Sequence, residues 1–246
     1  MANYKMLLQY DGTRYNGWQK QGDTKNTIQE KLETVLFRMT GEAVDVHGAG
    51  RTDAGVHAKG QVAQFRLTND LAPEDICTYL NTYLPDDIGV LSITEAAPRF
   101  HSRYNASQKT YRYRIGKNKA FHVFERKYIH EHRGEPLDVA AMKEAASLLV
   151  GEHDFKSFCG NPHMKKSTVR NLYDLQIRET PDEITLTFLG EGFLQYMVRI
   201  LVGTLIEVGE GRRDPLSMPA LLEARDRKLA GPTAPACGLT LIEVKY

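Results

Sequence analysis

The stretch TIQEKLETVLFRM, Thr27–Met39, has the pattern of an amphipathic helix, and it lies between segments that are typical of strands. Its apolar residues recur at helical spacing, at Ile28, Leu32, Val35, Leu36 and Met39. Thr27 and Glu30 stand where a capping box would satisfy the first backbone N–H groups of a helix. The pattern predicts a helix that turns one apolar face toward a core.

The segments on either side of this helix predict strands and a second helix. Tyr4–Tyr10 is typical of a strand and ends at the turn Asp11-Gly12. The elements expected after the helix are strands around Ala43–His47 and Gln61–Leu67, a helix from Pro73 to about Tyr83 and a strand over Ile88–Ala96. The predicted order of this half is therefore βαββαβ.

The rest of the chain repeats that order, although no repeat is visible residue by residue. The expected elements are a strand over Lys109–Ile115, a helix over Val139–Leu149, strands over Thr168–Arg178 and Glu183–Leu189, a helix from Phe193 to about Val208, a short helix after Ser217 and a strand over Gly238–Val244. We predict an α+β fold of two tandem ferredoxin-like (split βαβ) halves, 1–105 and 106–246, with a central cleft for a large substrate. The boundary is expected between Ala96 and Gln108.

The composition is that of an ordinary globular protein. The 246 residues are 41% hydrophobic and 26% charged, and 32 Lys and Arg against 31 Asp and Glu leave a formal charge of +1. The opening MANYKMLLQYDG lacks the apolar run of a signal peptide, and no stretch is long and apolar enough for a membrane span, so a cytoplasmic protein is expected. Three cysteines without a C-x-x-C pair indicate neither a disulfide framework nor a zinc site.

A glycine-rich stretch, GAGRTDAGVHAKGQ from Gly48 to Gln61, carries the strongest signal for chemistry. It lacks the Gly-Lys-Ser/Thr ending of a phosphate-binding loop and the glycine spacing of a dinucleotide fingerprint. His47, Asp53 and His57 lie close in sequence, but no second carboxylate cluster completes a metal-ligand set. The remaining interpretation is that Asp53 acts without a metal, as a nucleophile or a base.

An aspartate in that role needs a partner that keeps it ionised, and two arginines are candidates. Arg51 lies in the same loop, and Arg199 lies in the apolar stretch FLQYMVRILVGTLIEVG. Arg199 could equally be a snorkelling or purely structural arginine, and composition alone favours that reading.

The alternation in KTYRYRI predicts a strand with two different faces. Tyr111 and Tyr113 would share one face and Arg112 and Arg114 the other, which suits stacking on a base and contact with phosphate. Two half-buried sheet tyrosines explain the pattern equally well.

Local basic patches are a further sign of nucleic-acid binding in a chain that is nearly neutral overall. They lie at Lys109–Lys119, His163–Arg170 and Glu210–Asp214. Any single patch is more simply explained as a solvated charged surface.

Six blocks, in order along nearly the whole chain, resemble the TruA family of tRNA pseudouridine synthases. They are YDGTRYNGWQKQ, GAGRTDAGVHAKGQVAQF, RFHSRYNASQKTYRYRI, GEHDFKSF, GFLQYMVRILVGTLIEVGEGR and APACGLTLIEV. The resemblance implies a pseudouridine synthase fold and isomerisation of uridine to pseudouridine at positions 38, 39 and 40 of the tRNA anticodon arm. It also implies no cofactor and a homodimer that grips the tRNA with both subunits.

The resemblance also implies roles for individual residues. Asp53 matches the catalytic aspartate, and Arg51 matches a nearby arginine that helps to expose the target base. Tyr111 matches a tyrosine that packs on the target uracil, Arg199 an arginine that pairs with the aspartate, and Leu239 an apolar residue that lines the pocket.

Several alternatives stay open at the level of sequence. Asp53 could attack C1' or C6 of the nucleotide, or deprotonate C2' to give a glycal. An RNA-binding factor with a vestigial loop is a different class of function. A glycoside hydrolase is another, but it needs a second carboxylate near Asp53, and the loop offers none.

Overall fold

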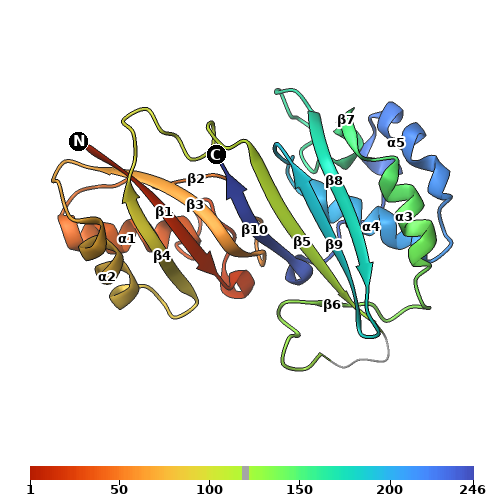
Figure 1. Ribbon diagram of the computed structural model, residues 1–246, viewed down its shortest axis with the longest axis horizontal. Helices are drawn as coiled ribbons and strands as arrows, with labels where there is room; N and C mark the ends of the chain where they lie inside the picture. Colours follow the sequence, from red (N-terminus) through yellow and green to blue (C-terminus); the bar gives the residue numbers. More distant parts are fainter. Residues whose placement is uncertain (118–121) are drawn as a thin grey trace. The chain divides into compact units, whose positions relative to one another are not determined.

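The computed structural model describes residues 1–117 and 122–246, and its chain divides into two compact units. Unit 1 consists of Met1–Ser107 with Leu241–Tyr246, and unit 2 consists of Gln108–Thr240 (Figure 1). The last residues of the basic patch predicted at Lys109–Lys119 lie outside the described residues. The division into two domains, 1–105 and 106–246, stays a prediction.

Unit 1 follows the predicted βαββαβ order. Its elements are β1 (Ala2–Tyr10), α1 (Ile28–Thr40), β2 (His47–Gly48), β3 (His57–Leu67), α2 (Pro73–Tyr83) and β4 (Ile88–Glu95), with a short 3-10 helix over Gly12–Arg14. The strands are hydrogen-bonded in the order β4-β1-β3-β2, and each of these pairs is antiparallel.

The helix predicted from Thr27 is confirmed, together with the cap at Thr27. Thr27 is the N-cap, and its side chain accepts a hydrogen bond from the Glu30 N–H at 3.3 Å. The helix ends at Gly41, which takes a φ of 73°. Glycine adopts this left-handed conformation without a steric penalty and commonly ends helices in this way.

The strand predicted over 43–47 is wrong for most of its length, because only His47 and Gly48 pair in the sheet. The Val46 N–H instead donates to Glu33 Oε1 of α1 at 3.0 Å. That carboxylate also accepts from Gln29 Nε2 at 2.7 Å and lies 3.1 Å from Lys20 Nζ. A buried side chain of the helix therefore takes the hydrogen bond that a strand neighbour would have made.

Unit 2 also follows the predicted order, with two additional short strands. It contains β5 (Gln108–Gly116), β6 (His130–Glu131), α3 (Val139–Ser147), β7 (Gly151–Asp154), β8 (Val169–Glu179), β9 (Glu183–Gly190), α4 (Met197–Gly209) and α5 (Met218–Ala224). Its strands pair in the order β5-β9-β8-β7, and β6 runs parallel to β5.

The start of α4 differs from the prediction, which placed it at Phe193. The helix begins at Met197 because Tyr196 has a φ of 59° and ends the preceding turn in the left-handed conformation. Such a conformation is uncommon for a residue with a side chain, and it interrupts right-handed helical geometry.

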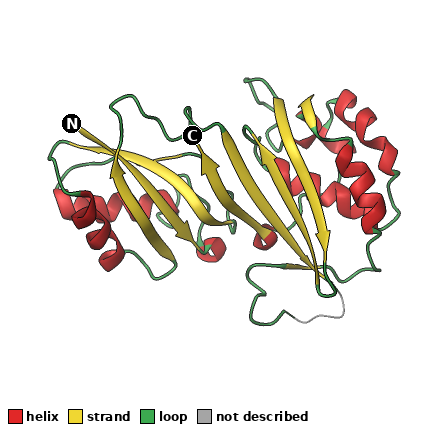
Figure 2. Cartoon of the chain, viewed as in Figure 1, coloured by secondary structure: helices red, strands yellow, loops and turns green. Residues whose placement is uncertain are grey.

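The last strand is β10 (Leu239–Lys245), and the fold is of the mixed α+β class. Figure 2 shows strands and helices in both parts of the chain. No helix in the described ranges 1–117 and 122–246 has the length and apolar composition that crossing a membrane requires.

Candidate active site

The loop that carries Asp53 ends in a tight turn. The Val56 N–H donates to the Asp53 carbonyl at 3.1 Å, and Gly55, the third residue of this turn, has a φ of 77°. A positive φ at that position is what a type II turn requires, and glycine provides it at the lowest cost. Thr52 is buried, whereas Arg51 is exposed and Asp53 is half-buried.

The segment Tyr15–Trp18 supports this loop through the backbone. The Trp18 N–H donates to the Thr52 carbonyl at 3.0 Å, and the Gly55 N–H donates to the Tyr15 carbonyl at 3.2 Å. Gly17 has a φ of 90°, and a Cβ there would lie 2.7 Å from the Thr52 carbonyl oxygen. Only glycine therefore lets the two backbones approach this closely.

A buried hydrogen-bonded chain fixes the loop from its inner side. The Tyr10 hydroxyl lies 2.8 Å from Thr52 Oγ1, and Gln61 Nε2 donates to the Tyr10 hydroxyl at 3.3 Å and to the Gly50 carbonyl at 2.8 Å. Burial raises the pKa of Tyr10 to about 12, so its hydroxyl keeps its proton near neutral pH. The residues on both sides of Arg51 are thus held by buried polar groups.

His57, which follows the turn, joins the loop to the Asp11-Gly12 turn. Its Nδ1 accepts from the Gly12 N–H at 3.0 Å and lies 3.2 Å from Asp11 Oδ1. Across the described part of the chain, no group of three or more His, Cys, Asp or Glu side chains is placed to hold one metal ion.

In unit 2, β5 has the two faces that its alternation predicts. Tyr111 and Tyr113 are buried, at 7% and 0% exposed. Tyr111 lies opposite Phe188 of β9, and its ring meets the Phe193 ring edge-on at 5.1 Å. On the other face, Arg114 pairs with Glu183 and Glu125 rather than remaining available to a phosphate.

Arg199 is held by one residue through both its backbone and its side chain. Its Nε donates to the Ala234 carbonyl at 2.7 Å, and its own carbonyl accepts from the Ala234 N–H at 3.0 Å. Its guanidinium lies 5.4 Å from the centre of the Tyr196 ring. The half-buried Arg199 side chain is therefore oriented by neighbours in unit 2.

The residues after Ala234 connect this arginine to β5 and to Leu239. The Tyr113 hydroxyl donates to the Pro235 carbonyl at 2.9 Å, and a Cβ on Gly238 would lie 2.6 Å from the Tyr113 ring. Leu239, the first residue of β10, is 4% exposed. Tyr113 thus braces the segment that runs from the Arg199 anchor to Leu239.

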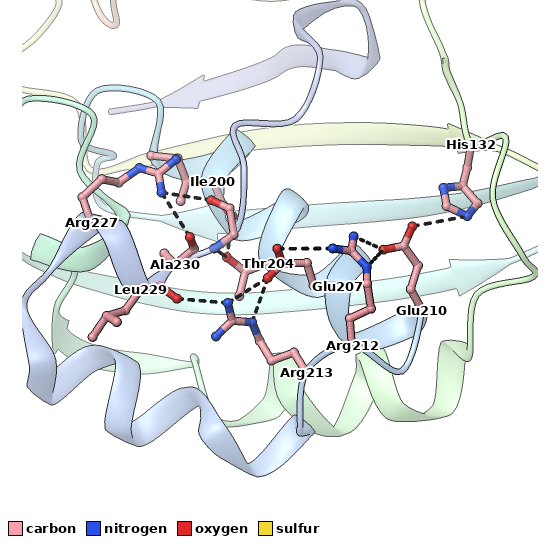
Figure 3. A network of polar contacts seen from close by, with 11 residues as sticks. His132, Ile200, Thr204, Glu207, Glu210, Arg212, Arg213, Arg227, Leu229 and Ala230 are labelled. Carbon is pink, nitrogen blue, oxygen red and sulfur yellow. Dashed lines mark hydrogen bonds and ion pairs between the residues drawn. The ribbon is translucent and has the colours of Figure 1, made fainter.

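Polar contacts from α4 hold the segment that leads into Ala234 (Figure 3). The buried Thr204 hydroxyl accepts from the Gly231 N–H at 2.9 Å and donates to the Ile200 carbonyl at 2.8 Å. Arg213 donates to Glu207 Oε2 at 2.7 and 2.9 Å and to the Leu229 carbonyl at 3.0 Å.

Arg227 adds to this support from within the segment itself. Its Nη1 donates to the carbonyls of Ala230 and Gly231 at 3.3 and 2.9 Å. Burial lowers the pKa of its guanidinium. The loop that receives Arg199 is consequently fixed at several points.

The predicted site residues belong to two sets. Arg51 and Asp53 share one loop of unit 1, and Tyr111, Arg199 and Leu239 belong to unit 2. The residues that hold them in place were not predicted from the sequence; they are Tyr10, Trp18, Gln61, Thr204 and Ala234. Of these, only Trp18 could have been suspected from the sequence, because it follows a glycine in the stretch YNGW, shortly after the strand predicted over Tyr4–Tyr10.

Comparison with known proteins adds independent information. A family described as "tRNA pseudouridine synthase" matches residues 6–105 and 145–246. The chain is 46% identical to the tRNA pseudouridine synthase A of Bacillus sp. (strain KSM-64), over 246 residues and the full length of both chains. It is 45% identical to the tRNA pseudouridine synthase A 2 of Bacillus cereus (strain ZK / E33L) and 46% identical to the tRNA pseudouridine synthase A 1 of Clostridium tetani, again over the full length of both chains.

Proposed function

The chain belongs to the tRNA pseudouridine synthase family, and from this premise we propose that it isomerises uridine to pseudouridine at positions 38, 39 and 40 of the tRNA anticodon stem-loop. The observation that carries the proposal is the loop of Asp53, whose neighbour Thr52 is fixed by Tyr10 and whose backbone is held by Trp18. A loop backbone held in this way limits the positions that the Asp53 carboxylate can take, which favours reaction with a bound nucleotide.

The reaction breaks the N1–C1' bond of uridine, turns the uracil, and joins C5 to C1', so that the proton on C5 is finally released. We assign Asp53 as the group that attacks the nucleotide or abstracts a proton from it. Arg199 is assigned the task of keeping that aspartate ionised, and its anchorage on Ala234 supports a fixed orientation for it.

The remaining residues are assigned to the substrate. Tyr111 would pack against the detached uracil, with its ring backed by Phe193, and Leu239 would contribute apolar surface. A base in a stem must leave the stack before it can react, which costs free energy. The exposed Arg51 is assigned to the space that the base leaves.

We also propose the finer architecture and the assembly that the family resemblance implies. The strand order β4-β1-β3-β2 in unit 1 supports a split βαβ arrangement, and β5-β9-β8 in unit 2 is compatible with a second one. The tRNA anticodon arm would bind in a cleft, and the protein would act in the cytoplasm as a homodimer without a cofactor. Light scattering of the purified protein, which should give twice the 27.8 kDa chain mass, tests the dimer.

Release of the C5 hydrogen tests the activity. A tRNA transcript labelled with tritium at C5 of uridine should release tritium to water with the wild type and not with Asp53→Asn. The control is Asp45→Asn, which should release tritium like the wild type, since Asp45 is an exposed aspartate of the same unit outside the loop. Equal release by wild type and Asp53→Asn would contradict the assignment of Asp53. No release by the wild type, with the tRNA still bound, would favour an RNA-binding factor.

A further inference from the structure

Three rings of unit 1 form a column that reaches the surface and that the proposed reaction does not use. The His47 and His101 rings are stacked at 5.7 Å and 26°, and the Tyr104 ring lies 4.3 Å from His101. Tyr104 is 72% exposed, an unusual state for a large aromatic side chain. His47 belongs to β2, the strand that leads directly into the loop of Asp53.

The middle ring of the column is held in place by its own loop. The His101 N–H donates to Asn105 Oδ1 at 2.7 Å, and the Asn105 N–H donates to the His101 carbonyl at 3.0 Å. The Arg103 N–H donates to His101 Nδ1 at 3.1 Å. The ring orientation is therefore fixed before any ligand arrives.

Ser102 ties this loop to the rest of unit 1. It is fully buried, and its hydroxyl donates to the His47 carbonyl at 2.6 Å. Its N–H donates to Gln64 Oε1, and its carbonyl accepts from the Tyr246 hydroxyl at 2.8 Å. A preorganised surface loses little conformational entropy when it binds, which strengthens binding.

The column lies in basic surroundings. Burial, and then the charges of His47, Arg103 and Arg66, lower the pKa of His101. His101 is thus an uncharged ring at neutral pH, and the two arginines are exposed nearby. An uncharged aromatic ring beside an arginine is a combination that binds unpaired nucleotides, with the base on the ring and the phosphate on the cation.

A second ring pair in the same unit shows what this surface has in addition. Tyr79 and Tyr83 of α2 lie 4.5 Å apart, and Tyr83 is 54% exposed. However, α2 contains no Lys or Arg, and its first turn carries Glu74 and Asp75. An acidic neighbourhood repels phosphate, so this pair is a matched control for the column.

We propose that an unpaired base of the RNA substrate stacks on Tyr104 at the outer end of the column His47–His101–Tyr104, and that Arg103 contacts its phosphate. This inference rests on the proposed function, because that function supplies an RNA whose loop bases are unpaired. It adds a base-binding position that is separate from the residues assigned to the target uridine.

The test measures the affinity of an unmodified tRNA transcript by fluorescence anisotropy at several salt concentrations. Tyr104→Ala should weaken binding by about five- to 150-fold, the range expected for loss of one base–ring stack, without changing the salt dependence. Tyr104→Phe, which keeps the ring, should bind like the wild type, as should Tyr83→Ala. Arg103→Ala should lower the slope of log affinity against log salt by about 1.

Two further outcomes separate the claims. A fully paired RNA duplex should bind the wild type and Tyr104→Ala equally, because its bases are already stacked on one another; an equal loss with duplex would overturn the assignment to an unpaired base. A wild type that forms pseudouridine while Tyr104→Ala binds tRNA undiminished would overturn the column and leave the proposed function intact. If the wild type forms no pseudouridine and Tyr104→Ala binds tRNA more weakly than the wild type, the proposed function would be refuted and the base-binding column would stand.

Discussion

The buried bridge between Tyr10 and Thr52 gives the sharpest prediction about how the loop of Asp53 is held. Tyr10→Phe removes one oxygen atom from a side chain that is 4% exposed, and it leaves the ring in place. Thr52 Oγ1 then loses its contact at 2.8 Å, whereas Gln61 Nε2 keeps the Gly50 carbonyl at 2.8 Å. The substitution therefore leaves mainly the Thr52 hydroxyl without its partner.

The expected cost follows from that orphaned group. Leaving a buried polar group without its hydrogen bond costs about 1–3 kcal/mol of the free energy of unfolding. Thr52→Val removes the other half of the bridge at similar volume and should cost a similar amount. The double variant leaves neither partner unsatisfied, so its loss should be smaller than the sum by about 0.5–3 kcal/mol.

Urea denaturation of the four proteins measures this coupling. Trp18 is the single tryptophan of the chain and is 1% exposed, and its backbone N–H donates to the Thr52 carbonyl. Its fluorescence therefore reports unfolding at the loop itself. Losses that add to within about 0.3–0.5 kcal/mol would show that the two hydroxyls act independently and would refute the bridge as a positioning device.

Three further predictions concern the backbone contact at Gly17, the loop that anchors Arg199, and the binding of RNA. Gly17→Ala should destabilise the protein by about 1–3 kcal/mol in the same urea titration, because Gly17 has a φ of 90° and a Cβ there would lie 2.7 Å from the Thr52 carbonyl oxygen. The control is Gly22→Ala, which should be close to neutral because a Cβ at Gly22 would meet nothing within 4 Å. Thr204→Val should cost about 1–3 kcal/mol by depriving the Gly231 N–H of its acceptor. It should also lower the rate of pseudouridine formation by loosening the loop that anchors Arg199, and an unchanged rate in a destabilised protein would contradict the role proposed for that loop. Affinity for tRNA should fall steeply as salt rises, and an affinity that stays flat from low to physiological ionic strength would argue against a phosphate-tracking surface.

Elements that depend on local signals could be predicted from the sequence. The cap at Thr27, the apolar spacing of α1 and the alternation in β5 all act within a few residues, and the structure confirms each of them. The prediction of a strand over 43–47 was wrong because the Val46 N–H donates its hydrogen bond to Glu33 of α1. The predicted start of α4 was wrong because Tyr196 adopts a left-handed conformation, which nothing in the local sequence demands.

The candidate site divides in the same way. Asp53 stands out in sequence because glycines frame it, and family resemblance assigns its partners. What holds the loop was not predictable, since Tyr10 reaches Thr52 from 42 positions away and Gln61 reaches Tyr10 from 51. Hydrogen bonds between distant residues leave no periodic trace in a single sequence, because only the fold brings the two groups together.

Pseudouridine mapping on a single tRNA shows whether the protein carries out the proposed isomerisation. Purified protein is incubated with an unmodified transcript that carries uridine at positions 38, 39 and 40, without added metal or nucleotide, with Asp53→Ala alongside. The proposed function predicts pseudouridine in the anticodon arm with the wild type and none with the variant, which should still bind the tRNA. An unmodified anticodon arm after incubation with a wild type that binds the tRNA would contradict it.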